Sequence, residues 1–404
     1  MTDVMQGIRI LEVAEQTFVP AASAILAEWG ADVIKIEHVE RGDAMRGLLS
    51  SGIMNLQSNV HVILEHSNRG KRSLGLDLTS DDGRAVLYQL AATSDVFLTN
   101  KLPSVRTKLK LDVDDIRAAN PDIVYVRGTG QGERGPDADK GAYDHLAYWC
   151  RAGVSMGATP EGDSPAGTPA PAFGDSIGAM TIAGGIMGAL LHRERTGEAT
   201  TVDVSLMGAG LWSMGAAIAL SLQTGMPWRL PPLTNGSGNP LVGNYVTGDG
   251  RWLAFSCLQL DKYWRNFVTL IGQPEMADDE RYTDHATIVA NADTAHATIA
   301  GVLASQPLSH WREVLEQFNG QWAVVQDTIE AAHDEQTVAN QYVQDYTTAE
   351  GVPFQLVTPP VQYGGVPGTP KRAPEFNEHG DDILQSIGLD WDTIIDLKVR
   401  GIVA

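Results

Sequence analysis

The first 130 residues alternate between short apolar runs and longer mixed segments. Residues 8–13 (IRILEV) and 31–37 (ADVIKIE) are apolar runs of strand length, and residues 21–29 between them have the composition of a helix that ends at Gly30. Further strands are expected at residues 73–78, 95–99 and 122–127, with helices at residues 81–92 and 113–120. Strands that alternate with helices predict an α/β fold whose parallel sheet is covered on both faces.

After residue 170 the pattern changes to long segments of small residues. Helices are expected at residues 177–192 and 205–222, joined by the polar turn RERTGEATT. Residues 204–222 carry no charge and are long enough to cross a membrane, but glycine, alanine and serine make them only mildly apolar. We therefore expect a buried core helix there rather than a membrane span.

A Pro/Gly/Asn-rich stretch at residues 226–239 indicates a linker or a mobile loop before a smaller unit. That unit begins with a hairpin signal at residues 244–255, around Asp249 and Gly250, and continues with helices near residues 262–271 and 295–303. From about residue 332 the chain mixes an extended region with two short helices. These patterns predict a large domain of residues 1–225, completed by about 332–404, and a smaller α+β domain of residues 226–331.

Composition narrows the classes of partner. The chain has 404 residues and a formal net charge of −21, whereas nucleic acid and anionic membrane surfaces both require a basic footprint. Cys150 and Cys257 are too few for a disulfide framework and are not spaced as a metal knuckle. The N-terminal sequence lacks the pattern of a signal peptide. We expect a cytoplasmic protein that binds small molecules and no metal.

The usual cofactor and catalytic motifs are missing from the sequence. A dinucleotide site needs GxGxxG directly after the first strand, where the chain reads AEQTFVP. The later GTGQGERG places Glu133 where the third glycine belongs, so a glycine-rich turn explains it better. GxxxxGK[ST], GxSxG and HExxH are also absent from the sequence. We therefore expect no nucleotide redox cofactor.

Positive charge gathers in two segments of this acidic chain, NRGKR at residues 68–72 and KLPSVRTKLK at residues 101–110. A solvated surface explains either segment alone equally well. Both segments, however, lie near the ends of predicted strands, where open α/β sheets bind their ligands. Because a few cations at short range outweigh screened repulsion from distant carboxylates, the two together favour a polyanionic ligand such as a nucleotide phosphate.

Asp175, in the stretch APAFGDSIGAM, is the main candidate for chemistry. An aspartate before a helix is a common N-cap, which is one explanation of its position. Ser176 could form the cap instead, and Gly174 would leave open space through which a substrate reaches the carboxylate. An aspartate with an ordinary pKa of about 3.9 is ionised at pH 7 and needs no base to attack an activated acyl group. Local sequence leaves both roles open.

The order and spacing of several motifs resemble the class III CoA-transferase family, which includes formyl-CoA:oxalate and carnitine CoA-transferases. The resemblance covers nearly the whole chain, and the family fold implies a Rossmann-like large domain, a smaller second domain and two interlocked ring-shaped subunits, that is, a homodimer. The motifs are GIRILEV, LAEWGADVIKIE followed by GD and Arg46, NRGKRSLGLDL, SDVFLTN with Pro103, NPDIVYV, Tyr143-Asp144, FGDSIGAM, GALLHRERTGE, VDVSL and APEFNEHGDDILQSIGL.

The resemblance implies that Asp175 is a nucleophile. It would take CoA from an acyl-CoA donor through a mixed anhydride and an aspartyl-CoA thioester, and a carboxylic acid acceptor would then receive the CoA. This chemistry needs no metal or redox cofactor, but water must be kept from the anhydride. The loop at residues 234–240 (TNGSGNP) resembles the family's mobile glycine loop, although an ordinary linker explains it equally well.

Matching positions imply the binding residues as well. The chain departs from the family at residues 18–20, where Ala-Gly-Pro is common, and at two positions where formyl-CoA transferase has arginines, now His38 and Lys108. These departures affect the expected phosphate contacts rather than the nucleophile. CoA contacts are implied at Gln16, Thr17, His38, Leu76, Thr79, Asn100, Lys101, Lys108 and Leu109, while Tyr143, Asp144 and Trp149 are expected near the acyl group.

Two other functions are compatible with the same fold. In α-methylacyl-CoA racemases a histidine directly precedes the aspartate that matches Asp144, and the two act as acid and base. Here Tyr143 takes that position and His145 lies on the other side, so a racemase would lack one of its two groups. A non-catalytic CoA-binding protein is the third alternative.

Overall fold

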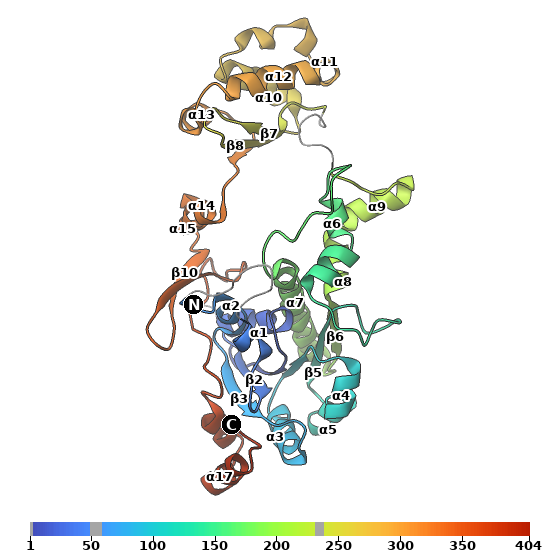
Figure 1. Cartoon of the computed structure of the whole chain (residues 1–404), viewed down its shortest axis with the longest axis vertical. Coiled ribbons are helices and arrows are strands. Elements are labelled where there is room, and N and C mark those ends of the chain that lie inside the picture. Colours follow the sequence, from blue (N-terminus) through green and yellow to red (C-terminus); the bar gives the residue numbers. More distant parts are fainter. Residues whose placement is uncertain (1–2, 49–58, 231–237) are drawn as a thin grey trace. The chain divides into compact units, whose positions relative to one another are not determined.

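Two units, each with its own hydrophobic core, make up the computed structural model of the chain (Figure 1). The structure describes residues 3–48, 59–230 and 238–404. The large unit comprises residues 1–157, 165–228 and 336–404, and the small unit comprises residues 158–164 and 229–335. Residues 158–164 were expected in the large domain, whereas in the structure Pro160 forms a β-bridge with Leu230 of the small unit.

A six-stranded parallel sheet forms the centre of the large unit (Figure 1). Its strands lie in the order β3-β2-β1-β4-β5-β6, so the chain leaves the adjacent pair β1 and β4 in opposite directions. Five of the six strands were predicted. The sixth, β6, was missed because it is an edge strand whose residues are half-buried or exposed. The strands are β1 (Arg9–Val13), β2 (Asp32–His38), β3 (Arg72–Leu76), β4 (Val96–Thr99), β5 (Val124–Thr129) and β6 (Thr201–Ser205).

Alternate residues of the central strands face two different cores. In β1, Ile10 belongs to a core shared with the first group of helices, whereas Leu11 belongs to a core shared with the second group. Strands covered on both faces need continuous apolar runs, and the predicted α/β fold with a two-sided parallel sheet is confirmed. The first group is α1 (Phe18–Glu28), α7 (Phe173–Thr196) and α8 (Leu206–Ser213); the second is α3 (Asp81–Ala92), α5 (Val113–Ala119), α16 (Gly380–Ser386) and α17 (Trp391–Val399).

The C-terminal segment returns to strand β3. Leu76 forms a β-bridge with Val403, and the Asp77 N–H donates to the carbonyl of Ile402 at 2.9 Å. Before this contact, β10 (Val343–Thr347) and β11 (Pro353–Val357) form an antiparallel hairpin, where the sequence pattern predicted only extended chain. The last 69 residues of the chain, residues 336–404, thus belong to the large unit.

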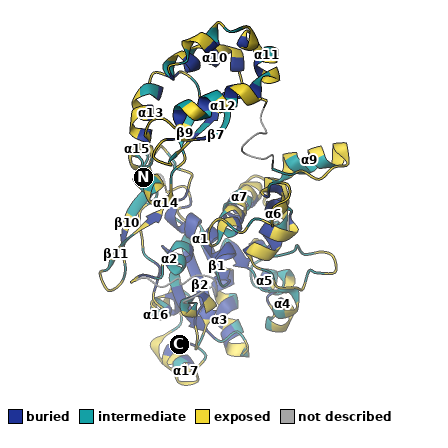
Figure 2. Ribbon diagram, turned by 45° about the horizontal axis from the view of Figure 1, so that its top comes forward, coloured by how far each residue is buried: buried dark blue, intermediate teal, exposed yellow. Residues whose placement is uncertain are grey.

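The uncharged segment at residues 204–222 does not form one buried helix. It forms α8 and then α9 (Gly215–Thr224), and the two helices are bent by 68° relative to each other. α8 packs closely on the π-helical turn η2 (His145–Arg151), because a Cβ at Gly210 would lie 2.7 Å from the Tyr148 carbonyl oxygen. α9 has no buried residue (Figure 2), so the expectation of a buried helix is wrong for this half.

By length and composition, α7 is one described helix that could cross a membrane, and α8 with α9 would be a second if the bent pair were one span. Seven residues of α7 are buried against the rest of the chain, as in the core helix of a globular unit.

The small unit is built on the three-stranded antiparallel sheet β7-β8-β9. The predicted hairpin is β7 (Val242–Val246) with β8 (Trp252–Ser256), and Gly250 in its turn has a left-handed φ of 77°. The predicted helices correspond to α10 (Leu260–Leu270) and α12 (Ala292–Leu303).

The remaining elements among the described residues of both units are η1 (Ala44–Gly47), α2 (Val62–Asn68), α4 (Pro103–Leu109), α6 (Val154–Gly157), η3 (Pro274–Ala277), η4 (Glu280–Tyr282), α11 (His285–Ala290), α13 (Leu308–Leu315), β9 (Trp322–Val324), α14 (Thr328–His333) and α15 (Glu335–Ala339).

Candidate active site

The turns that follow β1 and β4 are joined at the carboxyl edge of the sheet. The side-chain amide of Asn100 donates to the Glu15 carbonyl at 2.7 Å and accepts from the Glu15 N–H at 3.2 Å. Lys101 pairs with the Glu15 carboxylate at 2.8 Å. Because the chain runs in opposite directions from β1 and β4, this is the position where open α/β sheets bind ligands. The structure therefore brings together Gln16, Thr17, Asn100 and Lys101 of the predicted set.

Gln16 occupies an uncommon backbone conformation within this edge. Its φ is 72°, in the left-handed region that a residue with a Cβ seldom adopts. Its N–H donates to Oδ1 of Asp43 at 3.1 Å. Thr17 is buried at the start of α1, whereas Gln16 is half-buried. Of the two residues, Gln16 is the one whose side chain a ligand can reach.

The other predicted CoA contacts divide into exposed and covered side chains. His38 ends β2 and is exposed, and Lys108 is exposed on α4. Thr79 is also exposed, and its hydroxyl donates to the Asp77 carboxylate at 2.6 Å. Leu76 is buried in the core, and Leu109 packs against the same core. Leu76 as a whole is 1% exposed, so almost none of its surface is accessible from solvent.

Most cations of the two basic segments pair with internal carboxylates. The expectation that these segments bind a polyanion is therefore wrong for Arg69, Lys71 and Arg106, which are buried. The partners lie far away in the sequence, so the linear pattern could not show them. Lys108 and Lys110 remain exposed on or just after α4. The pairs are Arg69–Glu28 at 2.9 Å, Lys71–Glu12 at 2.7 Å, Arg72–Asp32 at 2.7 Å, Lys101–Glu15 at 2.8 Å and Arg106–Glu133 at 2.7 Å.

Asp175 lies in the first turn of α7 and does not cap that helix. The cap comes from Asp144, whose Oδ2 accepts a hydrogen bond of 2.9 Å from the N–H of Gly174. Ser176 does not cap the helix either, because its hydroxyl donates to the carbonyl four residues earlier at 2.9 Å. Neither residue that the sequence offered as the cap takes this role, since α7 already begins at residue 173. Asp144 leaves the Asp175 carboxylate free of the capping role.

Gly174 does not provide the open space expected from the sequence. A Cβ at this position would lie 2.3 Å from Cγ of Tyr148 and 2.5 Å from Oδ1 of Asp144. The glycine instead allows both groups to approach the start of α7. Phe173 packs edge-on against Tyr148 and Trp149, with ring centroids 6.3 and 6.1 Å apart. Tyr148 and Trp149 are buried, so aromatic rings support the backbone beside Asp175.

The ionisation of Asp175 also differs from the expectation. Burial, and secondly the negative charge of Asp144, raise the pKa of Asp175 to about 7. Burial raises the pKa of Asp144 as well, against main-chain N–H groups of residues 173–175 that lower it. At pH 7 a large fraction of Asp175 is therefore protonated, rather than fully ionised. A carboxyl group poised near neutral pH is common among catalytic groups.

Helix packing places the Gln16 turn and Asp175 at the same end of a helix pair. α1 and α7 pack against each other, and Phe18 at the start of α1 contacts Gly178, where a Cβ would lie 2.4 Å from the Phe18 ring. Gln16 precedes Phe18 by two residues, and Asp175 precedes Gly178 by three. Asp144 reaches the same end through its bond to Gly174, while the neighbouring Tyr143 is 68% exposed.

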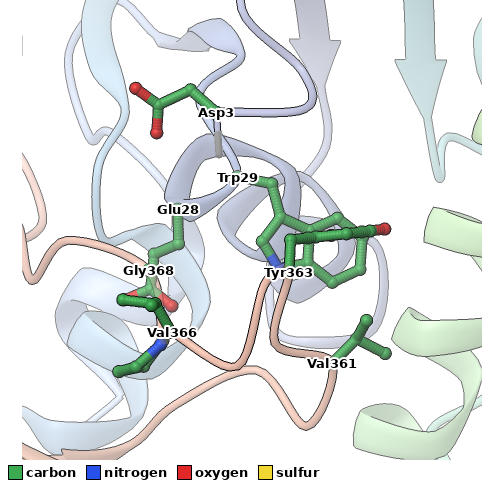
Figure 3. A pocket seen from close by; sticks show the side chains of 8 residues that line it. Asp3, Glu28, Trp29, Val361, Tyr363, Val366 and Gly368 are labelled. Carbon is green, nitrogen blue, oxygen red and sulfur yellow. The ribbon is translucent and has the colours of Figure 1, made fainter. Parts of the chain in front are cut away.

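A separate small pocket lies at the opposite end of α1 (Figure 3). Figure 3 shows Tyr363 beside Trp29, and their ring centroids are 5.3 Å apart in an edge-on contact. Glu28 in this pocket pairs with Arg69, and burial raises its pKa. Because α1 runs from the carboxyl edge of the sheet toward the amino edge, this pocket is distinct from the Gln16 turn. The lining residues are Asp3, Glu28, Trp29, Val361, Tyr363, Val366, Pro367 and Gly368.

Two further expectations concern a metal and a loop. Among residues 3–48, 59–230 and 238–404, no group of three or more His, Cys, Asp or Glu side chains is placed to hold a metal ion. The loop at residues 234–240 lies mostly outside the described residues, which resume at Gly238.

The fold and this site define an α/β protein with a half-buried, weakly acidic carboxyl group near the ligand-binding edge of its sheet. Residues 5–380 match CoA-transferase family III, and the chain belongs to that family. It is a class III CoA-transferase.

Relatives support this assignment over the full length. The chain is 28% identical over 402 residues to (R)-2-hydroxy-4-methylpentanoate CoA-transferase of Clostridioides difficile, covering 99% of both chains. It is 27% identical over 400 residues to cinnamoyl-CoA:phenyllactate CoA-transferase of Clostridium sporogenes, covering 98% of this chain and 96% of the relative. The crystal structure of a CAIB/BAIF family protein from Brucella suis matches with a TM-score of 0.78 at 25% identity, covering 95% of this chain and 99% of that one.

The sequence did not reveal the roles of two residues around the site. Asp144 was expected near the acyl group but not as the helix cap, because it lies 30 residues before its partner Gly174. Asp43, in the GD motif, was noted only as part of the resemblance and not as the acceptor of the Gln16 N–H. A glutamine in a tight turn between a strand and a helix is the local signal that could have prompted a search for such an acceptor.

Proposed function

We propose that the enzyme moves CoA from an acyl-CoA donor to a carboxylic acid acceptor, with Asp175 as the nucleophile. The observation that carries this proposal is the position of the Asp175 carboxyl group, which is half-buried in the first turn of α7 with a pKa of about 7. Asp144 satisfies the helix N-terminus, so the Asp175 carboxylate is not used as a cap.

Four substitution steps complete the proposed reaction. A carboxylate oxygen of Asp175 attacks the thioester carbonyl, the C–S bond breaks, and CoA thiolate and a mixed anhydride form. The thiolate attacks the aspartyl carbonyl and releases the donor acid, which leaves an aspartyl-CoA thioester. The acceptor carboxylate attacks the aspartyl carbonyl of that thioester, the C–S bond breaks, and CoA thiolate and a second mixed anhydride form. The thiolate then attacks the acceptor carbonyl of this anhydride and releases the Asp175 carboxylate. This yields acceptor-CoA and free Asp175, with thioester energy conserved throughout.

The residues at the carboxyl edge of the sheet supply the proposed CoA site. Gln16, Asn100 and Lys101 belong to the joined turns. His38 is exposed at the end of β2, the strand beside β1, and Lys108 is exposed on α4, which follows β4. The acyl-CoA would thus bind at the carboxyl ends of β1 and β4 in a Rossmann-like sheet. Water must be kept from the anhydrides, because hydrolysis would dissipate their energy.

A homodimer is part of the proposal. α8, α9 and the residues after them expose large apolar side chains, with Trp212 86% exposed, Leu222 80% and Met226 66%. An uncharged apolar surface of this kind typically marks a protein interface, and we propose that a second copy of the chain covers it. The proposal also retains the cytoplasmic location expected from the sequence.

The proposal is tested by trapping the covalent intermediates. The enzyme is mixed with a panel of acyl-CoAs, treated with hydroxylamine and digested, and the peptide that contains Asp175 is examined by mass spectrometry. We expect a hydroxamate at Asp175, and the donor that gives it is identified at the same time. Acceptors to be tried first are 2-hydroxy acids with apolar side chains, because the two relatives described above are named for such acids.

Two variants complete this test. Asp175→Asn should abolish both the hydroxamate and turnover while the protein stays folded. Ser176→Ala changes the neighbouring residue in the same helical turn and should retain both. Turnover by Asp175→Asn at the wild-type rate would refute the assignment of the nucleophile. Deuterium incorporation at the α-carbon of a 2-methylacyl-CoA without any acceptor would favour a racemase instead.

A further inference from the structure

A network of charged side chains is buried beneath the Gln16 turn. Lys35 pairs with Glu12 at 2.8 Å and with Asp43 at 2.7 Å, and all three side chains are 0% exposed. Lys71, also fully buried, pairs with the other oxygen of Glu12 at 2.7 Å. Charges removed from water are costly unless they are paired and hydrogen-bonded, as they are here. Each buried charge of the network therefore depends on its partners for stabilisation.

The same network holds the backbone of the turn at several points. Lys35 donates to the carbonyl of Ala14 at 2.9 Å, and Lys71 donates to the carbonyl of Pro20 at 2.8 Å. Between these two carbonyls, the N–H of Gln16 donates to Oδ1 of Asp43. The left-handed φ of Gln16 is a strained conformation, which persists only where surrounding contacts determine it. Asp43 supplies the contact to Gln16 itself.

The two carboxylate oxygens of Asp43 face different partners. Oδ1 accepts from the N–H groups of Gln16 and Met45, at 3.1 and 2.9 Å, and Oδ2 faces the ammonium of Lys35. An asparagine cannot reproduce this arrangement, because its amide has one acceptor and one donor group. Either the NH₂ would face the Lys35 ammonium, or it would face the two main-chain N–H groups. Position 43 therefore requires a carboxylate as long as Lys35 is charged.

We propose that Asp43 is a positioning residue of the active site, which, tied to Lys35 and Glu12, holds Gln16 in its left-handed conformation at the edge where acyl-CoA is bound. The role of Gln16 toward acyl-CoA rests on the proposed function, whereas the conformation of the turn can be measured without it. The network acts on the substrate through Gln16 and does not itself touch the reacting atoms.

The experiment compares Asp43→Asn, the double variant Asp43→Asn/Lys35→Met and wild type in two measurements. The first is amide hydrogen exchange of the peptide spanning residues 14–18, followed by mass spectrometry. The second is the KM for acyl-CoA and the kcat of CoA transfer. Asp43→Asn should speed exchange and raise KM about tenfold, as for loss of a hydrogen bond to a charged group, with a smaller change in kcat. In the double variant no ammonium faces the asparagine amide at position 43, so both losses should be partly recovered; recovery stays partial because the Ala14 carbonyl loses its bond from Lys35.

Asp95→Asn is the matched control. Asp95 also accepts from a main-chain N–H of β1, that of Arg9 at 2.9 Å, and pairs with Arg193 at 2.7 Å, but it lies at the amino edge of the sheet. It should leave the exchange of residues 14–18 and the KM unchanged.

The outcomes separate the positioning role from a merely structural one. Wild-type exchange and KM in Asp43→Asn, an equal KM increase in Asp95→Asn, or no recovery in the double variant would each overturn the inference. If Asp43→Asn does not fold, the double variant is compared with Lys35→Met alone. Equal hydrogen exchange of the turn in these two variants would show that asparagine can replace aspartate once Lys35 is absent, which supports the role of the Asp43–Lys35 pair. If wild type transfers no CoA, the proposed function fails, while hydrogen exchange still decides how Gln16 is held.

Discussion

Replacing Gly174 by alanine should disturb the start of α7 without changing any polar group. The added Cβ would lie 2.3 Å from Cγ of Tyr148, more than an ångström inside ordinary contact distance, and 2.5 Å from Oδ1 of Asp144. Neither neighbour can move freely. Tyr148 is 1% exposed and its hydroxyl donates to Ser213 at 2.9 Å, while Asp144 accepts the Gly174 N–H. The helix must therefore shift.

The magnitude follows from two opposing effects. Overpacking a well-filled site costs about 1–3 kcal/mol, and the better helix propensity of alanine returns about 1 kcal/mol. We expect the free energy of unfolding to fall by up to about 2 kcal/mol, which thermal or denaturant unfolding of the purified variant measures. The catalytic effect should be larger, because a shift of the α7 start displaces Asp175. Displacements of about 1 Å can reduce turnover about 100-fold.

Gly184→Ala provides the control within the same helix. A Cβ at Gly184 would meet no described atom within 4 Å, so the substitution should leave turnover unchanged and stabilise the helix slightly. The reasoning would be refuted if Gly174→Ala unfolded and turned over like wild type, or if Gly184→Ala caused the same loss of turnover.

Three further predictions address ionisation, charge and assembly. Because only ionised Asp175 attacks, and its pKa is about 7, kcat/KM should fall as pH drops below 7. Asp144→Asn keeps a capping oxygen but removes the negative charge beside Asp175, so the fall in kcat/KM should move to lower pH. Lys108→Ala should raise the KM for CoA thioesters several-fold, and the difference from wild type should shrink as salt is added. Replacing the exposed Lys262 of the small unit by alanine should leave the KM unchanged. An unchanged KM in Lys108→Ala would remove Lys108 from the proposed CoA site. Trp212→Asp should convert the proposed dimer to monomers in light scattering coupled to size-exclusion chromatography, and a wild-type mass would show that this surface is not the interface.

The central sheet could be predicted because its strands are buried on both faces. Such strands read as apolar runs regardless of their neighbours, as β1 and β2 show, and the boundaries were within a few residues. β6 was missed although Val202 and Val204 alternate with polar residues, because this edge strand is only five residues long and none of its residues is fully buried. α9 was misjudged for the opposite reason. Its composition is that of a core helix, but composition does not show whether the covering surface belongs to the same chain.

The site was predictable only in part. Asp175 was recognised from the surrounding motifs, whereas its raised pKa depends on burial and on Asp144, 31 residues earlier in the chain. The basic segments were misread because each pairing carboxylate comes from another element, distant in the sequence. Lys71, for example, pairs with Glu12 in β1, 59 residues away. Charge counted along a sequence does not reveal which cations the fold has already neutralised.

Glu133 has a consequence for where the phosphates of a substrate can bind. Its two oxygens face the guanidinium of Arg106 at 3.1 and 2.7 Å, and Arg127 lies 3.3 Å from it. The glycine-rich loop after β5 therefore carries its own internal anion, in the place where a phosphate group would satisfy the same arginines. Arg106 also pairs with Asp112 at 3.4 Å and Arg127 with Asp203 at 2.6 Å, so carboxylates of the chain already neutralise both arginines. The positive charge that stays exposed around this loop is therefore that of Arg134 within it and of Lys108 and Lys110 at the end of α4.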